Sequence, residues 1–249
     1  LDHRTVDGQH GLITDSHVTP GNIHDARPYL ERLDRQCQRF GLAPWAVGLD
    51  AGYNTAAVCH GLVERQIQGV VGYKRPHAPP GQFKPRQFLY DPQHDVYRCP
   101  GGEALPYATT TRNGYREYKS DPKVCVDCAL LGQCTRSRTH QKVVVRHVWE
   151  EERQQINQNR LTEWGKKIYA RRQETVERSF ADAKQLHGHR YARFRGLSKV
   201  QAQCLLAAAC QNMKKIPRLQ AVFYAFARLC KRIRAHYGLY VRDYFPRLS

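Results

Sequence analysis

A short apolar run, WAVGL at residues 45–49, ends on a charged residue, Asp50, and is followed by Gly52 and the helix-start pair Asn54-Thr55. An apolar run of this length between turn residues predicts a buried strand, and Asn54-Thr55 predicts the beginning of a helix. Asp50 is then either an ordinary strand exit or an active-site carboxylate held over the edge of a sheet.

Strand and helix patterns alternate along the first 74 residues. The predicted elements are strands over about 1–6 and 10–18, a helix over 22–40, the strand that ends at Asp50, a helix over 55–66 and a strand over 69–74. Asp7-Gly8 is the turn signal between the first two strands, and Gly41 ends the first helix. We expect Ile23, Tyr29, Leu30 and Leu33 to be the buried positions of that helix. The order predicts an α/β fold with a mixed sheet.

The composition of the sequence changes at residue 75. Pro and Gly become frequent there, and the predicted strands become short. A strand-like stretch over 142–149 precedes helical patterns over 151–185, 198–215 and 217–236. We expect two parts of one core, 1–74 and 143–215, separated by a small β-rich insertion over 75–142. A basic helix and tail over 216–249 complete the chain.

The charge balance is strongly basic. Lys and Arg number 40 against 22 Asp and Glu, a formal net charge of +18. The expected partner is therefore a polyanion, most plausibly nucleic acid, and the alternative is a merely soluble basic surface. The longest apolar run, CLLAAAC at 204–210, is far shorter than the roughly 18 residues of a membrane span. Nine cysteines without an export signal favour a reducing cytosol, where grouped cysteines bind metal more often than they form disulfides.

Four cysteines fall in the insertion. Cys125-x2-Cys128 forms a knuckle, Cys134 follows, and Cys99 can return from a neighbouring hairpin to complete a tetrahedral thiolate set for Zn²⁺. Such a site would let a segment with little core hold one shape. Two alternatives stay open: an iron-sulfur cluster and four reduced thiols without metal. We expect the other five cysteines to be small buried hydrophobes: Cys37, Cys59, Cys204, Cys210 and Cys230.

A second chemical pattern lies on the helix predicted to end near residue 185. Glu177 and Lys184 are seven residues apart and share a face, beside an apolar stripe of Val176, Phe180 and Ala183. A carboxylate there can hold a hard cation while basic side chains hold backbone phosphates of a nucleic acid. The surrounding bases are Arg171, Arg172, Arg178, Lys184, Arg190, Arg193 and Arg195. The alternative is an ordinary solvated helix face. Tyr191 and Phe194 either stack on a flipped base or, as we expect, pack into the core.

Four blocks of the sequence resemble bacterial insertion-sequence DDE transposases, with the closest similarity to the family eleven-eighty-two. The blocks are TVDGQHGLITDSHVTPGNIHDARPYLERL, AVGLDAGYNT, YKSDPKVCVDCALLGQCTRSR and RRQETVERSFADAKQLHGHRYARFRGL. The resemblance runs from residue 1 to about 215. It places the chain in the group whose last acid lies in a Tyr-Arg-Glu-Lys signature.

The resemblance implies an RNase H-like fold with helices on both faces of its sheet. It implies that three acids hold two Mg²⁺ or Mn²⁺ ions, with Asp50 as the second acid and Glu177 as the third. Lys184 fits the lysine of the signature. Tyr169 and Arg172 approximate its other letters, but four residues separate Arg172 from Glu177 where the usual pattern has three. The DNA-contacting residues would be Tyr169, Arg172, Arg178, Lys184, Arg190, Arg193 and Arg195.

The first acid of such a trio should lie on a strand upstream of Leu1, because only two strands precede the first predicted helix. Stand-ins are Asp2, Asp7, Asp15 and Asp25, and none fits; Asp25 falls in a first helical turn, where acids favour the helix dipole. We therefore expect an N-terminally truncated chain that lacks its first strand and is inactive alone.

The resemblance also implies partners and a place in the cell. The partners would be DNA, as transposon terminal inverted repeats and target DNA, and a second copy of the chain as a homodimer in a synaptic complex. The location would be the bacterial cytoplasm at the nucleoid. Two alternatives remain, a non-catalytic zinc-stabilised DNA-binding protein derived from a transposase and an RNase H-like nuclease without strand transfer.

Overall fold

The computed structural model describes residues 1–73 and 78–237, except for the side chains at 222, 223, 225–227 and 229–237. The chain forms two compact units. One unit combines Leu1–His24 with the chain from Arg171 onward, and the other is Asp25–Ala170. The boundary falls inside α6 (Glu163–Arg172), so one helix contributes residues to both units.

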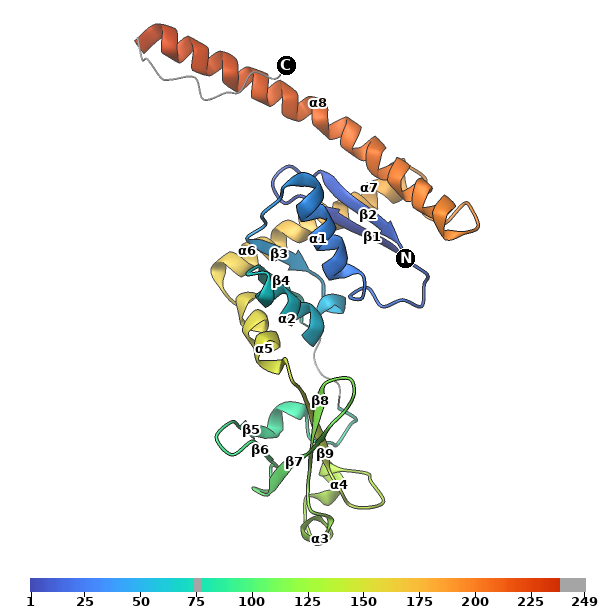
Figure 1. Cartoon of the computed structure of the whole chain (residues 1–249), viewed down its shortest axis with the longest axis vertical. Helices are drawn as coiled ribbons and strands as arrows, with labels where there is room; N and C mark the ends of the chain where they lie inside the picture. The colour runs from blue at the N-terminus through green and yellow to red at the C-terminus, as the bar shows by residue number, and fades with distance from the viewer. Residues whose placement is uncertain (74–77, 238–249) are drawn as a thin grey trace. The chain divides into compact units, whose positions relative to one another are not determined.

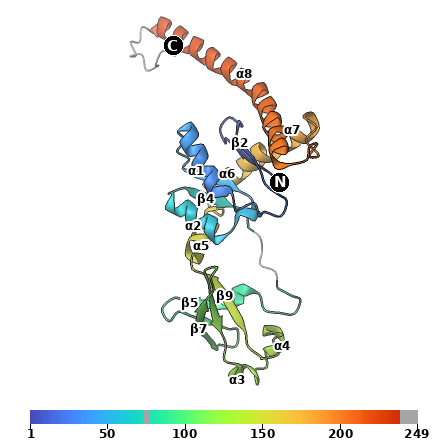
Figure 2. The same cartoon turned by 45° about the vertical axis from the view of Figure 1, so that its right-hand side comes forward.

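In the first unit, β1 (Asp2–Val6) and β2 (Ile13–Val18) pair antiparallel, as predicted. The second strand begins at residue 13 and not at 10, because residues 8–10 form the turn. Helix α8 (Leu197–Tyr237) runs along β2 in both Figure 1 and Figure 2.

Side-chain amides of α8 form hydrogen bonds with backbone N–H and C=O groups along the unpaired edge of β2. The Gln201 side chain accepts from the Val18 N–H at 2.8 Å and donates to the Ser16 carbonyl at 2.7 Å. The Asn212 side chain likewise accepts from the Ile13 N–H at 2.9 Å and donates to the Ile13 carbonyl at 2.8 Å. The helix therefore replaces a third strand at an edge that would otherwise expose unpaired backbone groups.

Helix α8 spans 41 residues and continues through Pro217. The prediction of two separate helices, over 198–215 and 217–236, was wrong. Proline removes one backbone hydrogen bond and crowds the preceding turn, but good helix formers on both sides carry the chain across it. Residues 238–249, the end of the predicted basic tail, lie outside the described residues.

The second unit contains a small core of strands and helices. Strands β3 (Ala46–Leu49) and β4 (Gln68–Val71) pair in parallel, and α2 (Ala56–Glu64) connects them. Helices α1 (Tyr29–Phe40) and α5 (Glu150–Asn159) also supply core residues. The core cluster comprises Tyr29, Leu33, Leu49, Val58, Cys59, Leu62, Ile67, Val71 and Ile156.

The first helix is shorter than predicted. It begins at Tyr29 and not at 22, because Pro28 occupies its N-cap and the preceding residues form turns. Ile23, expected to be buried, is consequently only half-buried. Gly41 ends the helix as predicted, with a left-handed φ of 61°. Thr55 caps α2 as predicted and accepts a hydrogen bond from the Val58 N–H.

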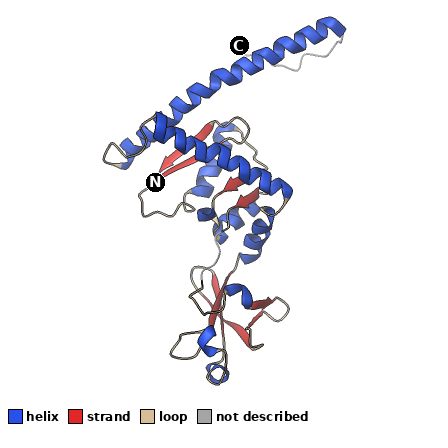
Figure 3. Cartoon of the chain, turned by 180° about the vertical axis from the view of Figure 1, so that it is seen from behind, coloured by secondary structure: helices blue, strands red, loops and turns tan. Residues whose placement is uncertain are grey.

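An antiparallel sheet of five strands lies in the part of the chain between residue 78 and α5 (Figure 3). The strands pair in chain order: β5 (Leu89–Asp91), β6 (Val96–Arg98), β7 (Ala104–Thr110), β8 (Tyr115–Lys119) and β9 (Val143–His147). Its core holds Phe88, Tyr97, Leu105 and Tyr118. Two one-turn helices, α3 (Pro122–Cys125) and α4 (Leu131–Cys134), lie between β8 and β9. Since β9 pairs with β8, this sheet continues through residue 147.

The predicted α/β class is confirmed, since strands and helices are mixed throughout the described chain. The expectation of a mixed sheet was wrong for the described residues: β1 and β2 pair antiparallel, β3 and β4 pair in parallel, and the five-stranded sheet is antiparallel throughout. An RNase H-like arrangement of the core stays a prediction. In the described part of the chain, no helix is both long enough and apolar enough to cross a membrane.

Gly72, directly after β4, has no room for a side chain. A Cβ there would lie 2.7 Å from the Ala51 nitrogen and 2.8 Å from the Tyr169 hydroxyl. We expect Gly72→Ala to lower the free energy of unfolding by about 1–3 kcal/mol, because backbone must move to admit the methyl group. Chemical denaturation measures this change. Gly132→Ala is the control, since nothing lies within 4 Å of its Cβ position; equal effects of the two substitutions would contradict the packing described.

Candidate functional site

Asp50 lies where the sequence predicts, at the carboxyl end of β3. Its Oδ1 accepts a hydrogen bond from the Gly52 N–H at 2.8 Å, which caps the one-turn helix η1 (Ala51–Tyr53). The side chain is half-buried. The strand itself is less buried than predicted. Only Leu49 is buried, and Trp45 is 64% exposed, with its ring centroid 5.6 Å from that of Trp164.

The loop after Asp50 is tied to two neighbouring elements. The Asn54 side-chain amide donates to the Gly72 carbonyl at 3.1 Å and to Oδ1 of Asn157 on α5 at 2.7 Å. Gly72 also donates its N–H to the Leu49 carbonyl at 3.0 Å. These bonds hold the carboxylate of Asp50 on a braced loop, as a preorganised site requires.

A second carboxylate, Asp25, lies near the same loop. A Cβ built on Gly52 would lie 3.1 Å from Oδ1 of Asp50 and 3.9 Å from Oδ2 of Asp25. The expectation that Asp25 occupies a first helical turn was wrong, because α1 begins four residues later. The argument from the helix dipole therefore does not apply to Asp25. The other stand-ins, Asp2, Asp7 and Asp15, belong to the first unit.

Glu177 ends a single π-helical turn, η3 (Gln173–Glu177), between α6 and α7 (Arg178–Leu186). Its Oε1 accepts a hydrogen bond from Nη1 of Arg172 at 3.0 Å, and 57% of its side chain is exposed. A π-turn contains about one residue more than an α-turn, so residues five apart return to the same side of the helix. The extra residue between Arg172 and Glu177 in the signature is thereby accommodated.

Glu177 and Lys184 line the same open hollow in the first unit. Phe180, Ala181, Gln185 and Arg190 complete its lining. Of the other predicted bases, Arg178, Arg193 and Arg195 are exposed, whereas the Arg172 side chain is only 13% exposed and pairs with Glu177. Behind this face, Ala183 is buried, and Val176 and Phe180 are half-buried. The hollow thus presents one carboxylate beside two cationic side chains.

The expectation that Tyr191 and Phe194 pack into the core was wrong. Their exposed fractions are 79% and 54%. They lie in the loop between α7 and α8, where Gly188 and Gly196 adopt positive φ and residues 190–196 are all exposed. Two large aromatic side chains therefore project among three exposed arginines: Arg190, Arg193 and Arg195.

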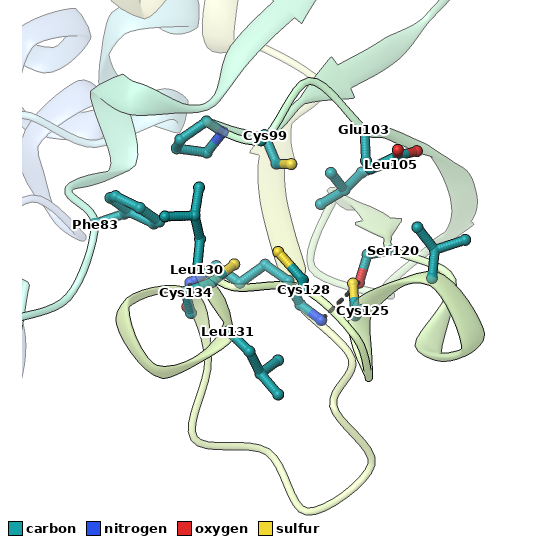
Figure 4. Close-up of a pocket in the computed structure, with 14 residues that line it drawn as sticks. Phe83, Cys99, Glu103, Leu105, Ser120, Cys125, Cys128, Leu130, Leu131 and Cys134 are labelled. Carbon is teal, nitrogen blue, oxygen red and sulfur yellow. Dashed lines mark hydrogen bonds between the residues drawn. The ribbon is translucent and has the colours of Figure 1, made fainter.

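The four cysteines of the predicted zinc site line one cavity of about 30 Å³ (Figure 4). Cys99 lies in the turn between β6 and β7, Cys125 and Cys134 end α3 and α4, and Cys128 lies between those helices. Burial raises the pKa of the Cys134 thiol, and the other three thiols add to this effect. These thiols therefore belong to one electrostatic cluster.

The sulfur atoms do not stand at the separations of a closed zinc site. Around a tetrahedral Zn²⁺ ion, thiolate sulfurs lie about 3.8 Å apart. Among the described residues, three or more ligand atoms within 4.8 Å of one another occur only at Asp2, His189 and Cys204. Binding of Zn²⁺ by the four cysteines would therefore require their sulfur atoms to come closer together.

The other cysteines divide by environment. Cys59 and Cys204 are buried, as expected, and Cys37 is half-buried. Cys210 is exposed, so the expectation for it was wrong; it falls on a side of α8 that β2 does not cover. The side chain of Cys230 lies outside the described residues.

A buried arginine that the sequence did not single out adjoins the helix of Glu177. Arg4 on β1 donates from Nη1 to the carbonyl and the hydroxyl of Ser179, both at 3.1 Å. Its guanidinium lies 4.7 Å from the Phe180 ring centroid. The sequence contains no signal that separates this arginine from the many exposed ones.

Residues 98–217 match the model of a family described as transposase DDE domain. The match supports a DDE transposase. The matched range contains the four cysteines, the π-turn with Glu177, and Lys184; Asp50 lies outside it. Transposases act on DNA, which agrees with the net charge of +18. No curated protein and no solved structure matches the chain.

The burial of the thiols predicts their reactivity in the native protein. Burial is the main cause that raises the pKa of Cys59 and of Cys204 to about 11. At pH 8 with a chelator present, we expect iodoacetamide to modify both at least ~100-fold more slowly than exposed Cys210, because little thiolate forms. Peptide mass spectrometry gives the rates. Comparable rates for Cys204 and Cys210 would show that α8 does not bury Cys204.

Proposed function

We propose that this chain is the catalytic domain of a cut-and-paste DDE transposase of the insertion-sequence family eleven-eighty-two. It would cleave DNA and transfer strands with the help of Mg²⁺ or Mn²⁺. The observation that carries the proposal is the family match over residues 98–217, which includes the turn where Arg172 holds Glu177. The partners would be terminal inverted repeats and target DNA, bound by a homodimer at the bacterial nucleoid.

The acids fit a hard cation. Carboxylate oxygens are the donors that Mg²⁺ prefers, and Asp50 supplies them from a braced loop beside Asp25. A carboxylate has about four acceptor sites, so the bond from Gly52 is compatible with a cation on the same side chain. The cations of such sites activate water or a 3′-hydroxyl and stabilise the leaving oxygen.

Glu177 would contribute from the other unit, so the proposal requires the two acids to meet in the active enzyme. Its ion pair with Arg172, at 3.0 Å, orients the carboxylate. Lys184 and Arg190, on the same hollow, would hold phosphates of the transposon end while Glu177 faces the reacting phosphate.

The loop over residues 188–196 would contact DNA. Arg190, Arg193 and Arg195 carry exposed charges suited to backbone phosphates, and Tyr191 and Phe194 offer aromatic faces on which bases stack. Exposure of both rings favours stacking over a packing role, because their removal would leave no core cavity.

The four-cysteine cavity would hold structural Zn²⁺ from Cys99, Cys125, Cys128 and Cys134. The grouping of four thiols in a segment with a small core supports this site. We expect Cys128→Ser to remove one equivalent of zinc and to lower the melting temperature. Elemental analysis and calorimetry measure both, with Cys37→Ser as the control. An iron-sulfur chromophore in the purified protein, or unchanged metal content in Cys128→Ser, would contradict the zinc site.

Replacing either of the two proposed catalytic acids, Asp50 or Glu177, tests the catalytic proposal. In the full-length protein, we expect Glu177→Gln or Asp50→Asn to abolish cleavage and strand joining on terminal-repeat DNA with Mg²⁺ or Mn²⁺. The affinity for DNA should persist, because the Arg and Lys side chains that bind the phosphates remain. Glu174→Gln is the matched control, an exposed acid of the same π-turn that pairs with Arg171. Cleavage by Glu177→Gln at the rate of the control would remove Glu177 from the mechanism; cleavage without strand joining in the parent protein would indicate a nuclease.

Replacing an exposed ring tests the DNA-contacting loop. We expect Tyr191→Ala or Phe194→Ala to weaken binding to terminal-repeat DNA by about 5- to 100-fold, the range for loss of one stacked base. Stability should be unchanged, since both side chains are exposed. Fluorescence anisotropy and thermal denaturation separate the two effects, with exposed Leu186→Ala as the control. Unchanged affinity would place the DNA elsewhere.

A further inference from the structure

Three potential metal ligands of different chemistry meet inside the first unit. Asp2 comes from β1, His189 from the loop after α7, and Cys204 from α8. Nε2 of His189 lies 3.2 Å from Oδ2 of Asp2 and 3.6 Å from Sγ of Cys204. The three ligand atoms all lie within 4.8 Å of one another, and Cys204 is buried. The site is separate from both the acids and the four-cysteine cavity.

The backbone conformation at Gly188 places the His189 side chain in this cluster. Gly188 takes a φ of +60°, and the His189 N–H then donates to the Ala183 carbonyl at 3.0 Å. The ring is 13% exposed, and its Nδ1 is buried with no hydrogen-bond partner in the described part of the chain. The orientation of the ring therefore depends on what Nε2 contacts.

The charges around the cluster can accommodate a divalent cation. Arg4 donates from Nε to Oδ2 of Asp2 at 2.9 Å, and Ser16 donates from Oγ to Oδ1 at 3.2 Å. A carboxylate has about four acceptor sites, so Asp2 can keep both bonds and still bind an ion. The Asp2 carboxylate and a Cys204 thiolate together supply two negative charges, which balance a divalent ion while Arg4 remains paired.

We propose that Asp2, His189 and Cys204 form a binding site for a zinc-class divalent cation. One oxygen, one imidazole nitrogen and one sulfur suit Zn²⁺ or Co²⁺ and not Mg²⁺, which prefers oxygen ligands alone. Three protein ligands leave a fourth position for water. The ion would take the place of the proton of the Cys204 thiol.

The position of the site gives it a structural consequence. The ion would join β1, α8 and the loop that follows α7, and Tyr191 lies only two residues beyond His189. A bound ion would therefore fix the base of the loop that carries the exposed aromatic rings, whether or not that loop binds DNA.

Cobalt binding to the chelator-stripped protein tests the site. We expect Cys204→Ser and His189→Gln each to lose one equivalent of Co²⁺ relative to the parent protein, together with the corresponding thiolate-to-cobalt absorption in Cys204→Ser. Cys210→Ser, the exposed cysteine on the same helix, should lose nothing. Cys128→Ser assigns the separate contribution of the insertion. Equal binding by folded His189→Gln and Cys210→Ser would overturn the proposal.

A second measurement needs no variant. In the parent protein at pH 8, we expect saturating Zn²⁺ to slow alkylation of Cys204 at least tenfold below its rate in chelator, with Cys210 unaffected. An unchanged rate for Cys204 would also overturn the proposal, even if a substitution prevented folding. Both tests read metal binding alone, so their outcome is independent of whether the protein transposes DNA.

Discussion

A buried arginine fixes the unit that carries Glu177. The Arg4 side chain is fully shielded from solvent, and its partners come from two elements: Asp2 on its own strand, and the carbonyl and hydroxyl of Ser179 on α7. Gln211 of α8 donates to the same Ser179 carbonyl at 3.1 Å and adds a third element. A buried hydrogen bond from a charged donor such as Arg4 contributes about 1.5–3 kcal/mol, and the donor left without its partner would be costly. Helix α7 therefore cannot slide along β1 without that cost, and Glu177 lies two residues before Ser179.

The π-turn completes this placement. Deleting or adding a residue in a regular α-helix rotates everything beyond it by about 100°. Here the wider turn at residues 173–177 absorbs the additional residue, so Arg172 still contacts Glu177 and Ser179 still reaches Arg4. The wider turn thus accommodates the one residue by which this sequence departs from the signature that it resembles. Single π-turns of this kind occur frequently at functional sites.

Local chemistry explains which features the sequence could predict. Asp50 after its strand, the cap at Thr55 and the stop at Gly41 depend on neighbouring residues, and the structure has all three. The merging of two helices through Pro217 and the exposure of Tyr191 and Phe194 depend on tertiary surroundings. The same holds for the gathering of Asp2, His189 and Cys204 from three distant segments, which no spacing rule connects. The expected helical position of Asp25 was wrong because α1 begins only after Pro28.

The proposed catalytic site requires Asp50 and Glu177 to hold the same cations, although the two acids belong to different compact units. Iron-directed cleavage of the polypeptide tests it most directly: Fe²⁺ replaces Mg²⁺ in the full-length protein, ascorbate and peroxide generate radicals at the ion, and mass spectrometry locates the cuts. We expect cuts near both residue 50 and residue 177 that excess Mg²⁺ suppresses and that Asp50→Asn removes at both places. Cuts near only one of the two acids, or cuts near residue 177 that persist in Asp50→Asn, would contradict it.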